Sequence, residues 1–358
     1  MFLKKLSVKL FAALFALTLV LSACGGGGEY RFTAFNGVDV TVQMRNKLLS
    51  AAAKTEIEDL LESLNAEFSA TAESSTVYKI NSAAAGERVA VSARFKEIAD
   101  DLTELFDLTE GRFDISVYPL TILWQFAPAF PVAKFSVPQQ EDIDRTLSVC
   151  GSDKFSFGEF AVKSASGAKI DFGGCLKGYA ADEIAKIIKQ DGATAGFINV
   201  GGSSLNLLYV DNLAIKHPRQ ENERILSVKI KAADLSVSTS GDYEKTYTSG
   251  GKTYSHIIDP KNGKPIDGGV ASATVIGKNG LKLDALSTAL CVCSHDFNIA
   301  EQGDLYRFIK KILSNDDYKD AQIFAVCTDG ENKQILTNKK QGEDFALLDN
   351  DFSVIYVA

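Results

Sequence analysis

Helix-forming and strand-forming segments occur in separate groups along this chain, and this grouping is the feature that most restricts its fold. Within residues 46–64, Ile57, Leu60, Leu61 and Leu64 recur at the spacing of one helical face. The same criterion predicts helices over residues 95–106 (closed by Gly111), 179–190, 284–293 and 305–312. Runs that alternate or are rich in β-branched and aromatic residues predict strands over residues 38–44, 197–200, 226–230, 270–276, 323–326 and 352–357. Because the two kinds do not alternate strictly, the sequence predicts an α+β fold rather than a doubly wound sheet.

The size and composition of the chain allow a large hydrophobic core. The chain has 358 residues, of which 46% are hydrophobic, and no internal repeat or second linker is visible. We therefore expect residues 30–358 to form one large domain or two intimately packed lobes.

The N-terminus has the features of a processing signal. Lys4, Lys5 and Lys9 precede an apolar stretch over residues 10–21, which is too short to cross a membrane comfortably. The stretch ends in Leu21-Ser22-Ala23-Cys24, which resembles the lipobox of bacterial lipoproteins, and four glycines follow. We expect residues 1–23 to be removed, Cys24 to be lipidated, and residues 24–29 to act as a flexible tether. This would place the chain on the extracytoplasmic side of the cell membrane, in the periplasm if the cell has two membranes. The alternative is an ordinary secretory cleavage site with an accidental cysteine.

Charge and cysteine content exclude several classes of partner and site. Removal of residues 1–23 takes away three lysines and no acidic residue, which lowers the formal net charge from −8 to −11. Such a chain has no basic run for nucleic acid, so its expected partners are small molecules or proteins at the membrane surface. Five cysteines follow Cys24 without a CxxC spacing, which disfavours a zinc site or a full disulfide framework. They are expected to be small buried residues, although one disulfide outside the cytoplasm is not excluded.

Asp284 and Thr288 are one helical turn apart and so lie on the same helix face. A carboxylate and a hydroxyl in this arrangement can share a hard cation such as Mg²⁺. The alternative is an acid near a helix start that serves as a cap or a dipole partner.

Three segments rich in glycine or small polar residues are candidates for ligand binding. The segment from Asp171 to Gly178 follows a predicted strand and opens a helix, where backbone N–H groups and Lys177 favour an anionic ligand such as a pyrophosphate. A tight turn with a solvated lysine explains the same residues. Residues 199–203 form a second glycine-rich turn, for which a plain turn is the alternative. Residues 238–243 form a polar cluster of small residues that can present hydroxyls and N–H groups to phosphate or to a nucleoside.

His256 is one of three histidines in the chain and leads into Ile257-Ile258-Asp259-Pro260. With an unperturbed pKa near 6.5, an imidazole at the end of a strand can relay a proton near neutral pH. A hydrogen-bonded structural histidine is the alternative.

Taken in order, these motifs resemble those of the ApbE family, the FAD:protein FMN transferases. The resemblance runs from about residue 30 to the C-terminus. It is carried by the segments 113–120 with Leu123-Trp124, 171–182, 199–202, 238–243, 256–260 and 284–288. It implies mixed sheets with packed helices, related to the T-fold, and a reaction in which FAD is cleaved at its pyrophosphate. FMN would pass to a threonine hydroxyl of an acceptor protein, and AMP would leave. The acceptors that this resemblance implies are membrane redox-pump subunits and other secreted flavoproteins.

The resemblance also assigns residues. It implies that Mg²⁺ is bound by Asp284, Thr288 and the main-chain carbonyl of Gly174, and that His256 assists proton transfer. The residues that it places at positions contacting FAD are Arg112, Phe113, Asp114, Asp171, Lys177 and Ile258. A magnesium ion on the diphosphate, with Lys177 beside it, is what phosphoryl transfer requires of a site.

Three departures from the family pattern bear on the chemistry. Residues 35–38 stand where relatives commonly have Met-Gly-Thr, and Ser287 stands where some have a third acid, which predicts weaker metal binding. Ser69-Ala70-Thr71 is the nearest match to a segment that often carries an aromatic ring, so Thr71 would leave the flavin without a stacking surface. Water could then compete with the acceptor, which makes an FAD pyrophosphatase giving FMN and AMP the nearest alternative. A non-catalytic FAD-binding lipoprotein is another.

Overall fold

A computed structural model describes residues 26–35, 37–127 and 135–358 of the chain. The predicted signal segment, Cys24 and Asn36 lie outside these ranges, so the predictions made for them are not addressed by the structure.

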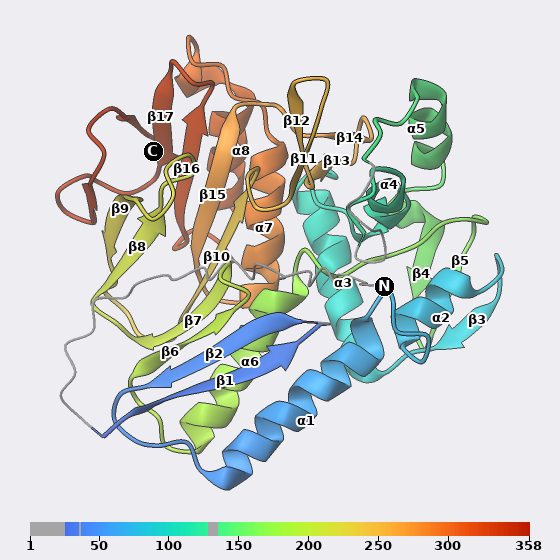
Figure 1. Cartoon of the computed structure of the whole chain (residues 1–358), viewed down its shortest axis with the longest axis horizontal. Coiled ribbons are helices and arrows are strands. Elements are labelled where there is room, and N and C mark those ends of the chain that lie inside the picture. The colour runs from blue at the N-terminus through green and yellow to red at the C-terminus, as the bar shows by residue number, and fades with distance from the viewer. Residues whose placement is uncertain (1–25, 36, 128–134) are drawn as a thin grey trace, which may run out of the picture.

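A mixed, largely antiparallel sheet forms the centre of the described part of the chain (Figure 1). Its nine strands, in spatial order, are β1 (Gly28–Ala34), β2 (Val38–Met44), β6 (Gly196–Val200), β7 (Ser204–Tyr209), β10 (Leu235–Gly241), β15 (Val270–Gly277), β16 (Gln322–Thr328), β17 (Lys333–Thr337) and β19 (Ser353–Tyr356). Neighbouring strands are antiparallel except β17 and β19, which are parallel.

Smaller sheets surround this main sheet. Two three-stranded sheets are formed by β18 (Phe345–Leu347), β9 (Arg224–Lys229) and β8 (Asn212–Lys216), and by β3 (Arg88–Ala90), β5 (Phe160–Lys163) and β4 (Phe155–Phe157). Two hairpins are formed by β11 (Thr246–Ser249) with β12 (Lys252–Ser255), and by β13 (Ile258–Asp259) with β14 (Lys264–Pro265).

The helices have the caps and apolar faces that stabilise short helices. The α-helices are α1 (Ala51–Phe68), α2 (Thr76–Ser82), α3 (Ala93–Leu108), α4 (Tyr118–Leu123), α5 (Gln140–Leu147), α6 (Leu176–Gln190), α7 (Gly280–Val292) and α8 (Asp304–Leu313). The hydroxyls of Ser50, Ser75 and Ser92 accept backbone N–H groups at the starts of α1, α2 and α3. Helix α6 packs against β6 and β7, and α7 packs against β10 and β15, with the two helices in mutual contact.

The central strands of the main sheet are buried on both faces because their side chains alternate between two hydrophobic clusters. On β16, Ile323 and Ala325 belong to the cluster shared with the helices, whereas Phe324 and Val326 belong to the cluster shared with β8, β9 and β18. The sheet therefore lies between a layer of helices and a second, smaller sheet.

The predicted α+β class is confirmed, with shifted boundaries. All five predicted helices are present, but α7 begins at Gly280, four residues earlier than predicted. Asn279 adopts a left-handed backbone conformation (φ 68°) and its side chain caps Lys282 N. Asp284 consequently lies in the second turn of α7, not at its start.

Two further observations concern the cysteines and the membrane. All five cysteines of the described residues are free, and all except Cys150 are buried, as expected for small apolar residues. Among the described residues, no helix is long and apolar enough to span a bilayer.

Candidate functional site

A cavity of about 430 Å³ lies where α6, α7 and the end of β10 meet the segments 69–71, 112–117 and 256–260. The sequence-predicted site residues that line it are Thr71, Arg112, Phe113, Asp114, Asp171, Gly174, Lys177, His256, Ile258, Asp284 and Thr288. Segments far apart in the chain are thus brought to one place, and the roles assigned to these residues remain predictions.

The glycine-rich turn before α6 directs polar groups into this cavity. Asp171 Oδ1 accepts a hydrogen bond from Gly173 N at 3.3 Å, which holds the turn. Lys177 Nζ donates to the carbonyl of Gly173 at 3.2 Å and lies 3.8 Å from Asp284 Oδ2. Burial lowers the pKa of Lys177, but the nearby carboxylates of Asp284 and Glu244 outweigh it, so the pKa is raised and the ammonium stays charged.

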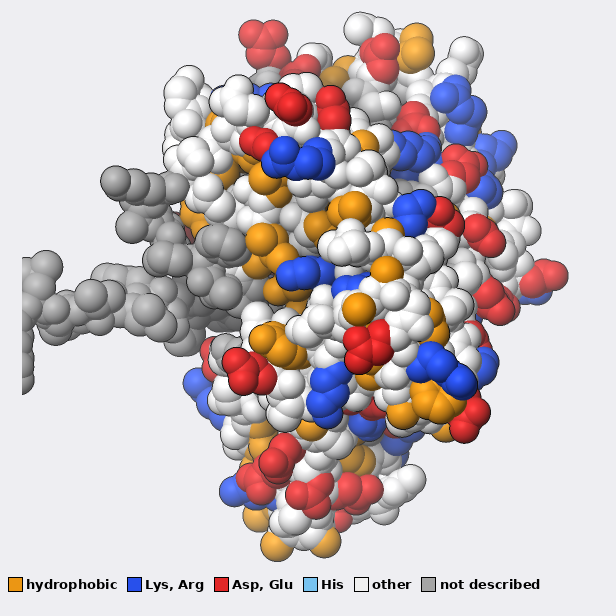
Figure 2. Space-filling model, turned by 90° about the vertical axis from the view of Figure 1, so that its right-hand side faces the viewer, with side chains coloured by type: hydrophobic (Ala, Val, Ile, Leu, Met, Phe, Trp, Pro, Cys, Tyr) orange, Lys and Arg blue, Asp and Glu red, His pale blue; other side chains and the backbone are white. Residues whose placement is uncertain are grey.

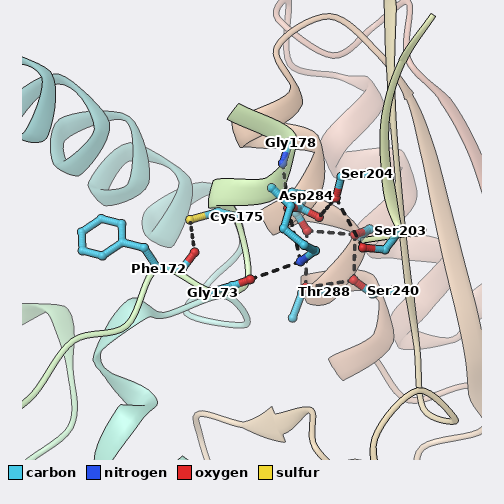
Figure 3. Close-up of polar contacts among 12 residues, drawn as sticks. Phe172, Gly173, Cys175, Gly178, Ser203, Ser204, Ser240, Asp284 and Thr288 are labelled. Carbon is cyan, nitrogen blue, oxygen red and sulfur yellow. Dashed lines mark hydrogen bonds and ion pairs between the residues drawn. The ribbon is translucent and has the colours of Figure 1, made fainter. Parts of the chain in front are cut away.

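Asp284 is almost fully buried and faces α6 rather than its own helix (Figure 3). Its Oδ2 accepts Gly178 N at 3.1 Å, and its Oδ1 accepts Ser204 Oγ at 3.0 Å. The Thr288 hydroxyl lies 3.3 Å from the main-chain carbonyl of Asp284 and 3.0 Å from Ser240 Oγ. Asp284 therefore does not cap its own helix, as the alternative interpretation had it, because α7 is capped by Asn279. Its carboxylate instead stabilises the start of α6 while it lines the cavity.

The oxygens around Lys177 suit a hard cation. Among the described residues, no three His, Cys, Asp or Glu side chains come together as a metal cluster. A cation here would be held by the carboxylate of Asp284, the hydroxyl of Thr288 and a carbonyl of the glycine turn. Mg²⁺ accepts such a set, since it binds through one or two carboxylates together with water and substrate phosphates. The ammonium of Lys177, bonded to Gly173 O beside Asp284, shows that this group of oxygens already accommodates a positive charge.

Ser287 occupies the position at which some proteins of the resembling family have a third acid. Its side chain is fully buried, donates to the carbonyl of Asp284 at 2.8 Å and contacts Ser240 Oγ at 2.8 Å. It therefore braces α7 against β10 without adding negative charge to the site.

His256 lies at the base of the β11–β12 hairpin, where its backbone N–H donates to the carbonyl of Lys245 at 3.0 Å. Its Nδ1 is buried and has no hydrogen-bond partner among the described residues. Burial, followed by the positive charges of Lys245 and Lys177, lowers the pKa of His256 to about 4. The imidazole is thus neutral near pH 7 and can accept a proton.

Other predicted contact residues are held firmly by their neighbours. Burial raises the pKa of both Asp114 and Asp171. The guanidinium of Arg112 is engaged by Glu110 at 2.7 Å and Asp304 at 2.6 Å, so its charge is already paired. Thr71 Oγ1 lies 3.3 Å from Ser69 Oγ. Residues 69–71 form the wall of the cavity that corresponds to the segment in which relatives often have an aromatic ring.

Sequence reasoning missed Glu244 and Lys245, which also line the cavity. Thr246 pairs with Ser255 in the hairpin, so Lys245 stands directly opposite His256. Burial raises the pKa of Glu244, although Lys177 opposes the shift. Recognition of the hairpin pairing in the sequence would have placed Lys245 beside His256.

The face in Figure 2 shows acidic and basic side chains intermixed around scattered hydrophobic ones. A continuous basic surface of the kind that nucleic acid requires is not seen on this face.

Comparison with known proteins points to one family. A family model described as the ApbE family matches residues 36–305. A protein of Vibrio cholerae named FAD:protein FMN transferase is 31% identical over 258 residues, which is 70% of this chain and 76% of the relative. A protein of the same name from Haemophilus influenzae is 26% identical over 318 residues, covering 83% of this chain and 91% of the relative.

Solved structures agree with the sequence matches. The apbe protein of Thermotoga maritima superposes with a TM-score of 0.71 at 29% identity, covering 84% of this chain and 94% of that one. The flavinyl transferase ApbE of Pseudomonas stutzeri, in its apo form, superposes with a TM-score of 0.72 at 24% identity, covering 87% and 94%, and supports the fold.

Proposed function

The chain belongs to the ApbE family and is an FAD:protein FMN transferase; we propose that it requires magnesium and transfers FMN to a threonine hydroxyl of an acceptor protein, releasing AMP. The observation that supports the proposal most strongly is the polar cluster of the cavity. Lys177, Asp284 and Thr288 meet there beside the glycine-rich turn, where a diphosphate would find a charged ammonium and oxygens for a cation.

The proposed reaction breaks the phosphoanhydride bond of FAD and forms a phosphoester bond to the acceptor threonine. The threonine oxygen forms a bond to the phosphorus of the FMN half, and the bond from that phosphorus to the bridging oxygen breaks. AMP leaves with the electron pair of that bond, and the threonine proton passes to a base. His256 suits this step because its imidazole is neutral and its buried Nδ1 has no other partner among the described residues.

The remaining residues position the diphosphate and its charge. Lys177 would neutralise phosphate oxygens, while the backbone N–H of Gly178 at the start of α6 holds the carboxylate of Asp284 in place. When bound by Asp284, Thr288 and the Gly174 carbonyl, Mg²⁺ would neutralise charge that develops on the diphosphate.

We further propose that the enzyme is a lipoprotein anchored through Cys24 on the extracytoplasmic face of the membrane. Support comes from the lysines, the apolar stretch and the small residues before Cys24. From that position it would modify a membrane or secreted flavoprotein, such as a subunit of a membrane redox pump.

A second activity, hydrolysis of FAD to FMN and AMP, is favoured by the wall at residues 69–71. This wall presents the small polar side chains of Ser69 and Thr71 to the cavity, where a ring would exclude water from the flavin side.

The metal assignment is tested by AMP release from FAD by residues 29–358, with and without magnesium. Asp284→Ala is expected to abolish AMP release while the circular dichroism spectrum stays that of the wild type. Asp316→Ala, which removes an exposed acid remote from the cavity, serves as the matched control. Unchanged AMP release by Asp284→Ala would remove Asp284 from the reaction, and FAD that stays intact in every sample would indicate a binding protein.

A further inference from the structure

Helices α6 and α7 cross with a reciprocal pair of hydrogen bonds. Gly178 N of α6 donates to Asp284 Oδ2 of α7 at 3.1 Å, and Gly280 N of α7 donates to Asp182 Oδ2 of α6 at 2.6 Å. In each helix the aspartate follows the glycine by four residues, so each helix start is stabilised by a carboxylate of the other. We call these four residues the α6–α7 crossing.

The backbones touch at the crossing. A Cβ atom at Gly178 would lie 2.0 Å from the carbonyl oxygen of Gly280, and one at Gly280 would lie 2.4 Å from the carbonyl oxygen of Gly178. Neither helix can therefore shift toward the other, and a shift away would break the two N–H to carboxylate bonds.

Residues of strands β7 and β10 donate hydrogen bonds to the carboxylates of Asp182 and Asp284. Asp182 Oδ1 accepts Ser236 Oγ at 2.6 Å and Asn206 Nδ2 at 2.9 Å, and these two strand residues pair directly across β10 and β7. Asp284 Oδ1 accepts from Ser204, which is two residues before Asn206 and therefore on the same face of β7. One buried polar strip of the sheet thus fixes both carboxylates.

We propose that Asp182, a half-buried acid outside the cavity lining, is a positioning residue that sets where Asp284 and Thr288 stand relative to Lys177. The inference rests on the proposed function for its chemical meaning. Lys177 immediately precedes Gly178 on α6, and Asp284 follows Gly280 by one turn on α7, so both charged groups are placed by the same crossing. The bond from Gly280 to Asp182 holds α7 at the end of the crossing opposite Asp284.

Asp182 affects the geometry of the site and not only the stability of the fold. The carboxylate of Asp284 is shared between Gly178, Ser204 and the ammonium of Lys177, which lies 3.8 Å away. A small movement of α7 would change that separation and hence the ability of Asp284 to hold a cation beside Lys177. The helix itself would remain folded against β10 and β15.

A binding experiment tests the proposal on the chemistry of the site. In Asp182→Asn, we expect the dissociation constant for Mg²⁺, measured by calorimetry on the purified protein without an acceptor, to rise about 10-fold, the lower end of the effect of removing a residue that orients metal ligands. The control is Glu183→Gln, which removes an acid from the next position of α6, where it pairs with Lys186. An Mg²⁺ affinity that is the same in Asp182→Asn and the wild type would overturn the proposal.

A second readout needs no metal. Hydrogen exchange is expected to accelerate at the amides of both Gly178 and Gly280 in Asp182→Asn, because the two bonds are coupled through the crossing. Acceleration at Gly280 alone would show a local cap and overturn the proposal, whatever the metal does. If the wild type takes up no Mg²⁺, the metal part of the proposed function fails, and the exchange pattern still decides the role of Asp182.

A milder variant guards against failure to fold. Ser236→Ala removes one partner of Asp182 and leaves the bond to Gly280, so a smaller change in the same direction is expected at both amides. No change at Gly178 in a folded Ser236→Ala protein would count against the coupling.

Discussion

Substitution of Gly178 by alanine tests the physical basis of the site, because it acts on the contact between α6 and α7. The added Cβ would stand 2.0 Å from the carbonyl oxygen of Gly280, whereas such atoms essentially never approach within 3.0 Å. The helices must therefore separate by about 1 Å or more at a point where both backbones are buried.

The expected loss of stability can be worked out from three contributions. Overpacking of this kind costs about 1–3 kcal/mol. Loss of the bond from Gly178 N to the carboxylate of Asp284 costs about 1.5–3 kcal/mol, as for hydrogen bonds to charged groups. The higher helix propensity of alanine offsets this loss of stability by about 1 kcal/mol. We therefore expect Gly178→Ala to lower the free energy of unfolding by about 1.5–5 kcal/mol.

Urea unfolding followed by circular dichroism measures this difference. Gly158→Ala is the matched control, because a Cβ at Gly158 meets no atom within 4 Å, and its change is expected to stay within about 1 kcal/mol. A Gly178→Ala protein as stable as the Gly158→Ala protein would refute the reasoning about the crossing.

Three further predictions concern the chemistry. Lys177→Ala is expected to weaken FAD binding about 10-fold or more, because the diphosphate loses a charged partner. Lys186→Ala, on the exposed side of α6, should leave FAD binding unchanged. Equal dissociation constants of Lys177→Ala and the wild type for FAD, measured by fluorescence titration, would show that Lys177 does not contact the ligand. Because the pKa of His256 is lowered, the imidazole is the deprotonated base above about pH 4, so the transfer rate should fall on acidification with a midpoint near 4 rather than 6.5. Lys245→Met should move this midpoint upward, since it removes a positive charge, and a midpoint near 6.5 in the wild type would contradict the assignment. Thr71→Tyr is expected to raise peptide modification relative to free FMN, and an unchanged product ratio would show that the wall at residue 71 does not control access of water.

Periodicity was sufficient for the elements that bury an apolar face, and insufficient where the buried face is polar. The stripe from Ile57 to Leu64 was predicted because its spacing shows which side faces the core, and the run over β16 because it is rich in β-branched and aromatic residues. Strand β10 was interpreted only as a polar cluster, since Ser236, Ser238 and Ser240 occupy its helix-facing side. The hydroxyl of Ser236 donates to Asp182, and that of Ser240 shares a hydrogen bond with Ser287. No local sequence pattern indicates partners so distant in the chain.

The candidate site also depends on contacts between distant parts of the chain, which sequence patterns do not reveal. Asp284 and Thr288 were predicted to share a helix face from their spacing alone, and they do. Their convergence with Lys177 and His256 was implied by the family resemblance, since helix geometry cannot bring α6, α7 and the β11–β12 hairpin together. The early start of α7 was missed because Asn279 caps the helix from a left-handed conformation that the sequence does not reveal.

The central claim is most directly tested by the fate of the FMN half of FAD. The protein comprising residues 29–358 is incubated with FAD, Mg²⁺ and an acceptor peptide containing one threonine, beside the same peptide with alanine in its place. Peptide mass and AMP are then measured together. The account predicts AMP in equal amount to an FMN-modified threonine peptide, with the alanine peptide unmodified. AMP accompanied only by free FMN, also with a folded acceptor flavoprotein in place of the peptide, would contradict transfer and establish a hydrolase.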